Sequence, residues 1–217
     1  MIERVINSIN LDGQYIFVIK REHNEKYNLE EVLRSIKKDA VIYYVDKTTD
    51  GAACTALLTR YEIGTNESLL IANSDQFIKY NLRNFIINCG ANDGSILTFY
   101  SNHPKWSYAL TNQDGLVTKV AEKSVISENA TVGIYYFKRG SDFVEGANSM
   151  IEKNIRVNNE FYICPVYNEL IEKGLLINTT KINQMYGMGT PEDLQDLLNC
   201  NTLRKINLNI NLFNETV

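Results

Sequence analysis

Short runs of β-branched and aromatic residues alternate with amphipathic stretches in the first part of the chain. The runs Tyr15–Lys20, Ala40–Val45 and Ser68–Asp75 predict strands. Three stretches between and after them predict helices: one capped by Asn28, one from Asp50 to about Tyr61, and one at Leu82–Cys89. An order of strand, helix, strand, helix is typical of an α/β layered domain with a largely parallel sheet.

The pattern changes beyond residue 93, where apolar runs are separated by turn residues. Four successive runs predict antiparallel strands at 95–101, 106–111, 117–122 and 131–137. Helices are predicted at 142–153, 161–173 and 192–199, with a strand at 182–188. Residues 205–213 alternate strictly between apolar and polar positions, which predicts an edge strand or a swapped arm.

These elements predict an α/β fold: a Rossmann-like layered domain with a mixed, mainly parallel central sheet flanked by helices, plus antiparallel strands in the second half. The chain contains neither a low-complexity linker nor an internal repeat. We therefore expect a single domain over residues 1–199, with halves at 1–93 and 94–199, followed by a tail at 200–217.

Length and charge narrow the classes of function. The 217 residues suffice for one well-cored domain, and a net charge of −4 is too balanced for a general nucleic-acid binder or a polybasic membrane binder. The apolar runs are far shorter than the roughly 20 residues of a membrane span, and we expect no leader segment. Four dispersed cysteines and two histidines encode neither a zinc site nor a disulfide framework. We expect a soluble, cytoplasmic protein.

Asp75 is the first candidate for chemistry, because it follows an apolar strand. Ligands of open α/β sheets bind beyond the carboxyl ends of the strands, and Mg²⁺ prefers carboxylate, water and phosphate oxygens. A carboxylate that merely caps a loop is an equally good interpretation of its position.

Two further segments are weaker candidates. Asp50, Gly51, Ala52 and Ala53 open a helix with small residues, so a base or phosphate could approach backbone N–H groups, although neither a P-loop nor a GxGxxG motif is present. Val120–Lys123 ends a predicted strand with an acid and a base. Glu122 could accept hydrogen bonds from sugar hydroxyls and Lys123 could hold phosphate, whereas an exposed ion pair would explain the same residues without a function.

Six segments carry a resemblance through their order: Met1–Ile9, Asp50–Leu57, Leu70–Asp75, Val120–Lys123, Ala130–Phe137 and Met188–Leu194. Together they resemble the motifs of the sugar-phosphate nucleotidyltransferases, which join a nucleoside triphosphate to a phosphorylated acceptor and release pyrophosphate. Met1–Ile9 resembles the family's "P-M-I-E-x-V-I" helix, and Met188–Leu194 contains its "G-T-P-E-D-L". Val120–Lys123 resembles "V-x-E-K-P", with Ser124 at the place of the proline.

The resemblance implies a role for each candidate. Asp75 would bind Mg²⁺ between the triphosphate and the incoming phosphate, with Asn73 or water helping. The backbone of Gly51, Ala52 and Ala53, next to Asp50, would face the base. In the second, acceptor-binding half, Glu122 and Lys123 would hold the acceptor, and Gly133 would leave room for it. The implied partners are an NTP and a sugar phosphate or a similar small phosphorylated acceptor. A homo-oligomer stays open.

Two features depart from the family pattern. The family begins with a strand and a "G-x-G-x-R" loop that cradles the triphosphate, and this sequence starts after that region. The family also often carries a second metal aspartate, and the corresponding position here is Gly187. Because losing one group that stabilises charge costs about 10²–10³ in rate, we expect this chain to be weakly active or inactive.

Other functions stay open at this point. One is a non-catalytic relative that binds a nucleotide or a sugar phosphate, or a subunit that another chain completes. Another is a nucleotide-sugar-dependent glycosyltransferase, although Asn73-Ser-Asp75 lacks the first aspartate of an Asp-x-Asp motif. The base and the acceptor cannot be read from the sequence. The short C-terminal part resembles stand-alone enzymes of surface-polysaccharide pathways.

Overall fold

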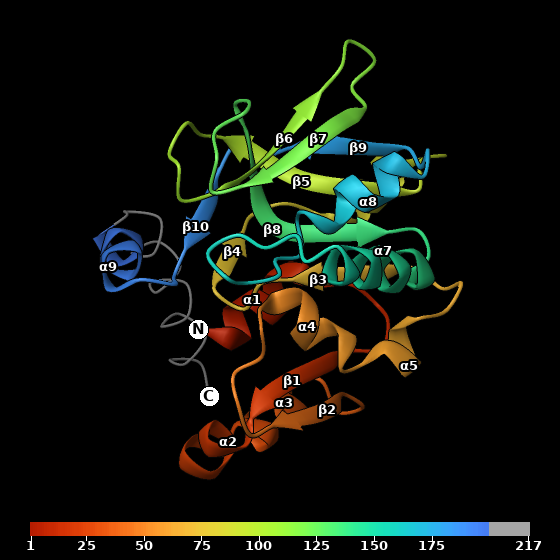
Figure 1. Ribbon diagram of the computed structural model, residues 1–217. Helices are drawn as coiled ribbons and strands as arrows, with labels where there is room; N and C mark the ends of the chain where they lie inside the picture. The colour runs from red at the N-terminus through yellow and green to blue at the C-terminus, as the bar shows by residue number, and fades with distance from the viewer. Residues whose placement is uncertain (200–217) are drawn as a thin grey trace.

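The computed structural model describes residues 1–199, so the predicted tail strand lies outside the described residues. Its largest sheet has six strands (Figure 1). They are β3 (Leu69–Ala72), β5 (Gly94–Tyr100), β6 (Ser107–Thr111), β7 (Val117–Glu122), β8 (Asn129–Phe137) and β9 (Ile177–Lys181). The order is β7-β6-β8-β5-β9, and β3 pairs with the second half of β8.

The strand β8 organises the core because successive side chains point to opposite faces. Val132, Ile134 and Tyr136 join the apolar cluster on one face, where α6 (Leu82–Cys89) packs. Tyr135 and Phe137 join the cluster on the other face, which α7 (Gly140–Glu152) and α8 (Val166–Glu172) cover. The sheet is therefore buried on both faces, as an α/β layered domain requires.

The mixed α/β class is confirmed, with fewer parallel pairings than expected. Among the described residues, β1 (Ile16–Lys20) pairs in parallel with β2 (Val41–Val45), and β5 pairs in parallel with β9. The other pairings are antiparallel: β3–β8, β5–β8, β6–β7, β6–β8, and β4 (Gln76–Ile78) with β10 (Met185–Gly187). The reason is that β3 leads into the short β4 (Gln76–Ile78) and pairs with β8, and not with β1.

β1 and β2 form a separate two-stranded sheet in the lower part of Figure 1. This sheet packs on α3 (Leu29–Ile36) and α1 (Ile2–Ile9) through a cluster centred on Ile6, Ile19 and Leu33. An additional helix, α2 (Arg21–Tyr27), follows β1 directly. It has no buried residue, so the apolar periodicity that predicts a helix is absent from its sequence.

Four boundaries differ from the predictions. The helix predicted over 50–61 is divided into α4 (Ala52–Leu57) and α5 (Arg60–Ile63). The helix predicted from 161 begins only at Val166, after the N-cap Pro165. The strand predicted at 182–188 is replaced by β9, which ends at Lys181, and by β10 (Met185–Gly187), which pairs with β4. The predicted strand 68–75 ends at Ala72. The last helix, α9 (Pro191–Asn199), lies where it was predicted.

No helix within residues 1–199 is long and apolar enough to cross a membrane.

Candidate functional site

A pocket of about 390 Å³ lies where the β3–β4 turn, β8, the β6–β7 hairpin and the segment before α9 meet. Six of the predicted site residues line it: Ala52, Asn73, Asp75, Glu122, Lys123 and Gly133. They come from segments that are far apart in the sequence, and the fold brings them to one place.

Asp75 lies in the turn between β3 and β4, where the end of the half-buried strand β3 reaches the pocket. Its carbonyl oxygen accepts a hydrogen bond from Met188 N–H (2.8 Å). A Cβ on Gly189 would come within 2.4 Å of Asp75 Oδ2, so the chain passes close to this carboxylate. Partial burial raises the pKa of Asp75, and the nearby negative charge of Asp193 raises it further, against a hydrogen bond from its own backbone N–H. No basic side chain within residues 1–199 pairs with it.

Gly133 forms a close-packed wall of the pocket in the middle of β8. Its φ is +79°, a conformation that favours glycine. A Cβ here would lie 2.0 Å from Gln76 Oε1 and 2.5 Å from Asn73 Nδ2. Gln76 is buried, and its Oε1 has no hydrogen-bond partner among the described residues. Because a buried unpaired amide is costly, this wall is suited to a ligand that brings a hydrogen-bond donor.

Glu122, the last residue of β7, and Lys123, which follows it, also line the pocket. Burial raises the pKa of Glu122, while a hydrogen bond from the Ser107 hydroxyl and the charge of Lys123 lower it. Lys123 has a φ of +51°, and its backbone N–H donates to Trp106 O (3.0 Å). Its Nζ donates to the Tyr162 hydroxyl (2.7 Å), which raises the pKa of Lys123 and keeps it cationic.

Asp193 adds a second carboxylate that the sequence interpretation did not single out. A Cβ on Gly187 would lie 3.3 Å from Asp193 Oδ2, so this carboxylate occupies the space beside Gly187. Lys105 Nζ binds Asp193 Oδ1 (2.9 Å), and this ion pair lowers the pKa of Asp193. The backbone N–H of Asp193 donates to Thr190 Oγ1 (3.1 Å) as a helix cap.

Other residues of the pocket gave weaker signals in the sequence. Gln76 directly follows Asp75, and Asp193 lies within Met188–Leu194, so proximity to a predicted motif could have identified both. Lys105, Ser107 and Tyr162 line the pocket through tertiary contacts alone.

Three predicted nucleotide-binding residues lie outside this lining. Asp50 forms an exposed ion pair with Arg156 (3.3 Å). Gly51 and Ala53 are buried against Phe161: Ala53 N–H donates to Phe161 O (2.9 Å), and a Cβ on Gly51 would lie 2.5 Å from the Phe161 backbone. Only Ala52 of this segment is exposed towards the pocket.

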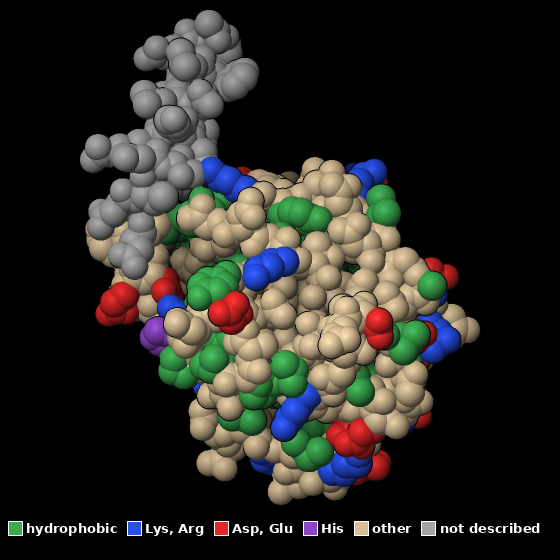
Figure 2. All heavy atoms as spheres, turned by 90° about the horizontal axis from the view of Figure 1, so that it is seen from above, with side chains coloured by type: hydrophobic (Ala, Val, Ile, Leu, Met, Phe, Trp, Pro, Cys, Tyr) green, Lys and Arg blue, Asp and Glu red, His purple; other side chains and the backbone are tan. Residues whose placement is uncertain are grey.

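The donor set of the pocket is made of oxygens. Among the side chains that the structure describes, no group of three or more from His, Cys, Asp or Glu is arranged to hold a metal. The pocket instead offers the carboxylates of Asp75 and Asp193 beside the amides of Asn73 and Gln76. Figure 2 shows one face of the molecule, on which positive and negative side chains are interspersed.

Comparisons with known proteins identify the family and the fold. The family model described as nucleotidyl transferase matches residues 1–185. No curated protein matches the chain. Among solved structures, a nucleoside-diphosphate-sugar pyrophosphorylase from Vibrio cholerae RC9 is similar with a TM-score of 0.76 and 24% identity, covering 91% of this chain and 86% of its own.

Two more distant structures share the fold. A putative glucose-1-phosphate thymidylyltransferase from Bacillus anthracis gives a TM-score of 0.63 at 17% identity, over 83% of this chain and 73% of its own. The inositol-1-phosphate CTP transferase from T. maritima gives 0.65 at 12% identity, over 83% and 71%.

Proposed function

Because the chain belongs to the nucleotidyl transferase family, we propose that it transfers a nucleoside monophosphate from an NTP to a sugar phosphate or a similar phosphorylated acceptor, with release of pyrophosphate. One observation supports the proposal: Asp75 and the Glu122–Lys123 pair line a single pocket of about 390 Å³. That arrangement suits a reaction in which two anionic phosphates must be held side by side.

The residues divide between the two substrates. Lys123 Nζ, held by Tyr162 and cationic, binds the acceptor phosphate. Glu122 accepts hydrogen bonds from acceptor hydroxyls. The expectation that Gly133 leaves room for the acceptor changes, because Gln76 and Asn73 fill the space beside it, and Gly133 instead lets these two amides pack against β8 at the pocket. The nucleotide lies on the side of Asn73 and Ala52. Asp50, Gly51 and Ala53 contribute indirectly, by fixing the position of α4. Gly51 and Ala53 do so because they pack against the backbone of Phe161.

The oxygen donors near Asp75 fit Mg²⁺, which prefers carboxylate, carbonyl and water ligands. Asp75 would hold the ion, Asp193 would supply a second carboxylate if Lys105 releases it, and Asn73 or Gln76 would supply an amide oxygen. When bound, Mg²⁺ offsets the negative charge of the phosphates.

We expect turnover by this chain to be weak. The cations that line the pocket among the described residues are Lys105 and Lys123, and Lys105 is paired with Asp193. Little positive charge is therefore free to stabilise a transferring phosphoryl group. In the cell, the reaction would serve nucleotide-sugar and surface-polysaccharide biosynthesis.

Pyrophosphate release tests the proposal. The purified chain is incubated with Mg²⁺, each of CTP, UTP and dTTP, and a panel of sugar phosphates and polyol phosphates. We expect release that depends on one nucleotide and one acceptor, and a Lys123→Met variant should raise the acceptor KM about tenfold or more while leaving nucleotide binding unchanged. Lys119→Met is the matched control, because Lys119 lies on the same strand and does not line the pocket.

Three results separate the alternatives. Nucleotide binding in a titration without pyrophosphate release from any pair would indicate a non-catalytic relative. Sugar transfer from a nucleotide sugar would indicate a glycosyltransferase. A chain that binds neither nucleotide nor sugar phosphate would refute the proposal.

A further inference from the structure

Lys123 follows β7 with an unusual backbone conformation. Its φ of +51° lies in the left-handed region, which few side chains other than those of asparagine and aspartate adopt. Its backbone N–H donates to Trp106 O (3.0 Å), just before β6. Such conformations persist where the surrounding structure holds them, and they cluster at functional sites. The backbone of Lys123 is therefore fixed, whereas its flexible four-carbon side chain needs a contact of its own to be held in place.

The phenol of Tyr162 supplies that contact. Lys123 Nζ donates to the Tyr162 hydroxyl (2.7 Å) and lies 4.9 Å from the centroid of the Tyr162 ring. This hydrogen bond is the main cause that raises the pKa of Lys123. A lysine ammonium has three N–H donors, so two of them remain for a phosphate after one has gone to Tyr162.

The partner of Lys123 is a neutral group, and this distinguishes the two lysines that line the pocket. Lys105 Nζ forms an ion pair with Asp193 (2.9 Å). Among the side chains that the structure describes, no carboxylate forms such a pair with Lys123, although the negative charges of Glu122 and Glu160 raise its pKa from further away. A phosphate that binds Lys105 has to displace a carboxylate, whereas the Tyr162 hydroxyl orients Lys123 and leaves its charge available to a phosphate.

Tyr162 is itself held by its neighbours in the chain. Phe161 and Ile163, on either side of it, are buried. Phe161 N–H donates to Asp50 O (2.8 Å), and Ala53 N–H donates to Phe161 O (2.9 Å). These two hydrogen bonds join the segment to the start of α4, so Tyr162 approaches Lys123 from a different part of the fold than β7.

We propose that Tyr162 is a positioning residue: its hydroxyl holds the Lys123 ammonium where the acceptor phosphate binds, and leaves the positive charge available. The inference rests on the proposed function, because it concerns the residue proposed to bind that phosphate. A side chain that is ordered before binding loses less conformational entropy when the ligand arrives. The hydroxyl should therefore strengthen phosphate binding through Lys123 and not through a contact of its own.

Phosphate binding by the full chain and three variants tests the proposal. The probe is inorganic phosphate, and the NMR signal of the Trp106 indole N–H reports its binding, because Trp106 lines the pocket and is the single tryptophan of the sequence. Tyr162→Phe removes the hydroxyl and keeps the ring, and it should weaken phosphate binding about three- to tenfold. Lys123→Met should weaken it about tenfold or more. The double variant should bind phosphate no more weakly than Lys123→Met, because the hydroxyl acts through the ammonium.

A second measurement follows the lysine side chain directly. NMR relaxation of the Lys123 Cε group, assigned by comparison with Lys123→Met, should show greater motion in Tyr162→Phe than in the unmodified chain. Tyr15→Phe is the matched control, because Lys37 Nζ lies 4.1 Å from the centroid of the Tyr15 ring and the Tyr15 hydroxyl donates to Leu11 O (3.0 Å), outside this pocket. The control should change neither phosphate binding nor the motion of Lys123.

The possible results separate this inference from the proposed function. If Lys123→Met weakens phosphate binding and Tyr162→Phe does not, the proposed role of Lys123 stands and the positioning role of Tyr162 is overturned. If the two substitutions add their effects in the double variant, Tyr162 contacts the phosphate itself, which also overturns the positioning role. If Lys123→Met binds phosphate as tightly as the unmodified chain, the role of Lys123 in the proposed function fails, and the inference fails with it.

Discussion

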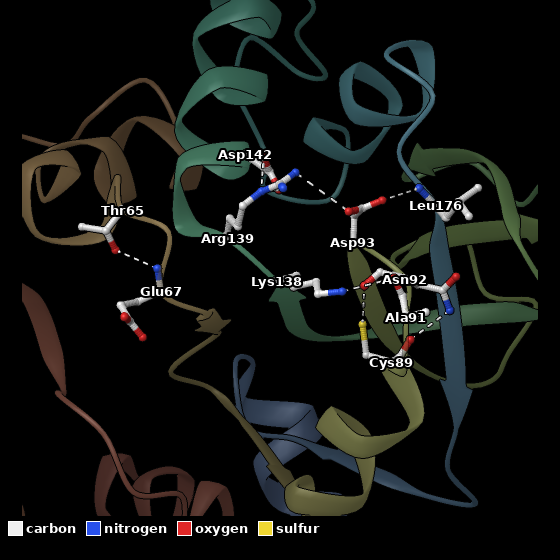
Figure 3. A network of polar contacts seen from close by, with 10 residues as sticks. All are labelled: Thr65, Glu67, Cys89, Ala91, Asn92, Asp93, Lys138, Arg139, Asp142 and Leu176. Atoms are coloured by element: carbon white, nitrogen blue, oxygen red, sulfur yellow. Dashed lines mark hydrogen bonds and ion pairs between the residues drawn. The ribbon is translucent and has the colours of Figure 1, made fainter.

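Two regions along β8, one beyond its last residue and one beside Gly133 in its middle, contain similar polar residues in opposite conditions. Beyond its last residue, Asp93 and Asp142 surround Arg139, and the network shown in Figure 3 pairs them. Arg139 Nε donates to Asp142 Oδ2 (3.0 Å), and Leu176 N–H donates to Asp93 Oδ2 (3.1 Å). In the pocket near Gly133, by contrast, Asp75 lacks a basic partner among the described residues, and Gln76 Oε1 lacks any hydrogen bond there.

The difference in pairing indicates a difference in role: the paired polar groups support the structure, and the unpaired polar groups are available to a ligand. The paired groups around Arg139 connect the start of β9, the end of β8 and the start of α7. They therefore stabilise the fold. Unpaired groups in the pocket cost stability, and folded proteins retain such groups mainly where they serve function. Substitutions in the pocket should therefore affect catalysis, and substitutions in the region beyond the last residue of β8 should affect stability.

The largest expected effect is on catalysis, from Asp75→Asn. The variant removes the carboxylate proposed to hold Mg²⁺ and keeps the shape of the side chain. Pyrophosphate release should fall by about 10²-fold or more, and Mg²⁺-dependent nucleotide binding should weaken. Turnover assays and titrations with and without Mg²⁺ measure the two effects.

Asp93→Asn is the matched control in the region beyond the last residue of β8. It loses the charge facing Arg139 and keeps an oxygen that can accept from Leu176 N–H. Its turnover should stay within about twofold of the unmodified chain, because the substitution lies outside the pocket lining. Equal losses in the two variants would contradict the division of roles.

Gly133→Ala should have the next largest effect. A left-handed φ costs an alanine about 1–2 kcal/mol, and the new Cβ would also clash with Gln76 Oε1 at 2.0 Å. We expect a loss of about 2–3 kcal/mol in the free energy of unfolding and a raised acceptor KM. Urea unfolding and steady-state kinetics measure these quantities.

Gly115→Ala isolates the backbone contribution. Gly115 has nearly the same φ, +77°, and a Cβ there meets nothing within 4 Å. It should lose only about 1 kcal/mol and keep its kinetics. If Gly115→Ala were as damaging as Gly133→Ala, the packing of Gln76 against Gly133 would not matter.

Much of the fold could be predicted from local patterns. The strand 117–122 and the helix 82–89 lie at their predicted bounds, because apolar periodicity and turn residues determine them locally. The direction of β3 could not be predicted, since pairing with β8 depends on residues more than sixty positions later. The strand Ile177–Lys181 was missed because its buried residues Ile177 and Thr180 show no clear alternation.

The site was predicted in part, through motif order. Asp75, Glu122 and Gly133 line one pocket, as the resemblance implied, and their roles remain predictions. Tyr162 could not be found from the sequence, because only the tertiary fold brings its hydroxyl to Lys123 Nζ. Asp193 differs from Tyr162, because it lies within the predicted motif Met188–Leu194, but only the structure shows that its carboxylate fills the space beside Gly187.

A smaller effect, on stability alone, is expected from Asp142→Ala. The Asp142 side chain is 10% exposed and accepts two hydrogen bonds from Arg139 Nε, at the start of α7. Its loss removes a charge-assisted pair and a favourable charge at a helix N-terminus, together about 1–2 kcal/mol. Melting temperature should fall by about 3–6 °C, with turnover unchanged. A loss of turnover at a temperature where the variant is folded would contradict a purely structural role.

The smallest expected effect is a pH dependence of stability that arises from Asp75. Because burial raises its pKa in the folded protein, Asp75 stabilises the fold below its ordinary value of 3.8, and this contribution disappears as the pH rises through the raised pKa. Asp75→Asn never ionises. Its stability relative to the unmodified chain should therefore increase as the pH rises from 3.8 through the raised pKa of Asp75, and then stay constant. Urea unfolding over a series of pH values from the acid side to neutrality measures the difference, and Asp193→Asn should give the opposite sign, because Lys105 lowers the pKa of Asp193. A difference for Asp75→Asn that did not change with pH would show that the Asp75 carboxylate is as well solvated when folded as when unfolded, which would remove the contrast between the two regions along β8.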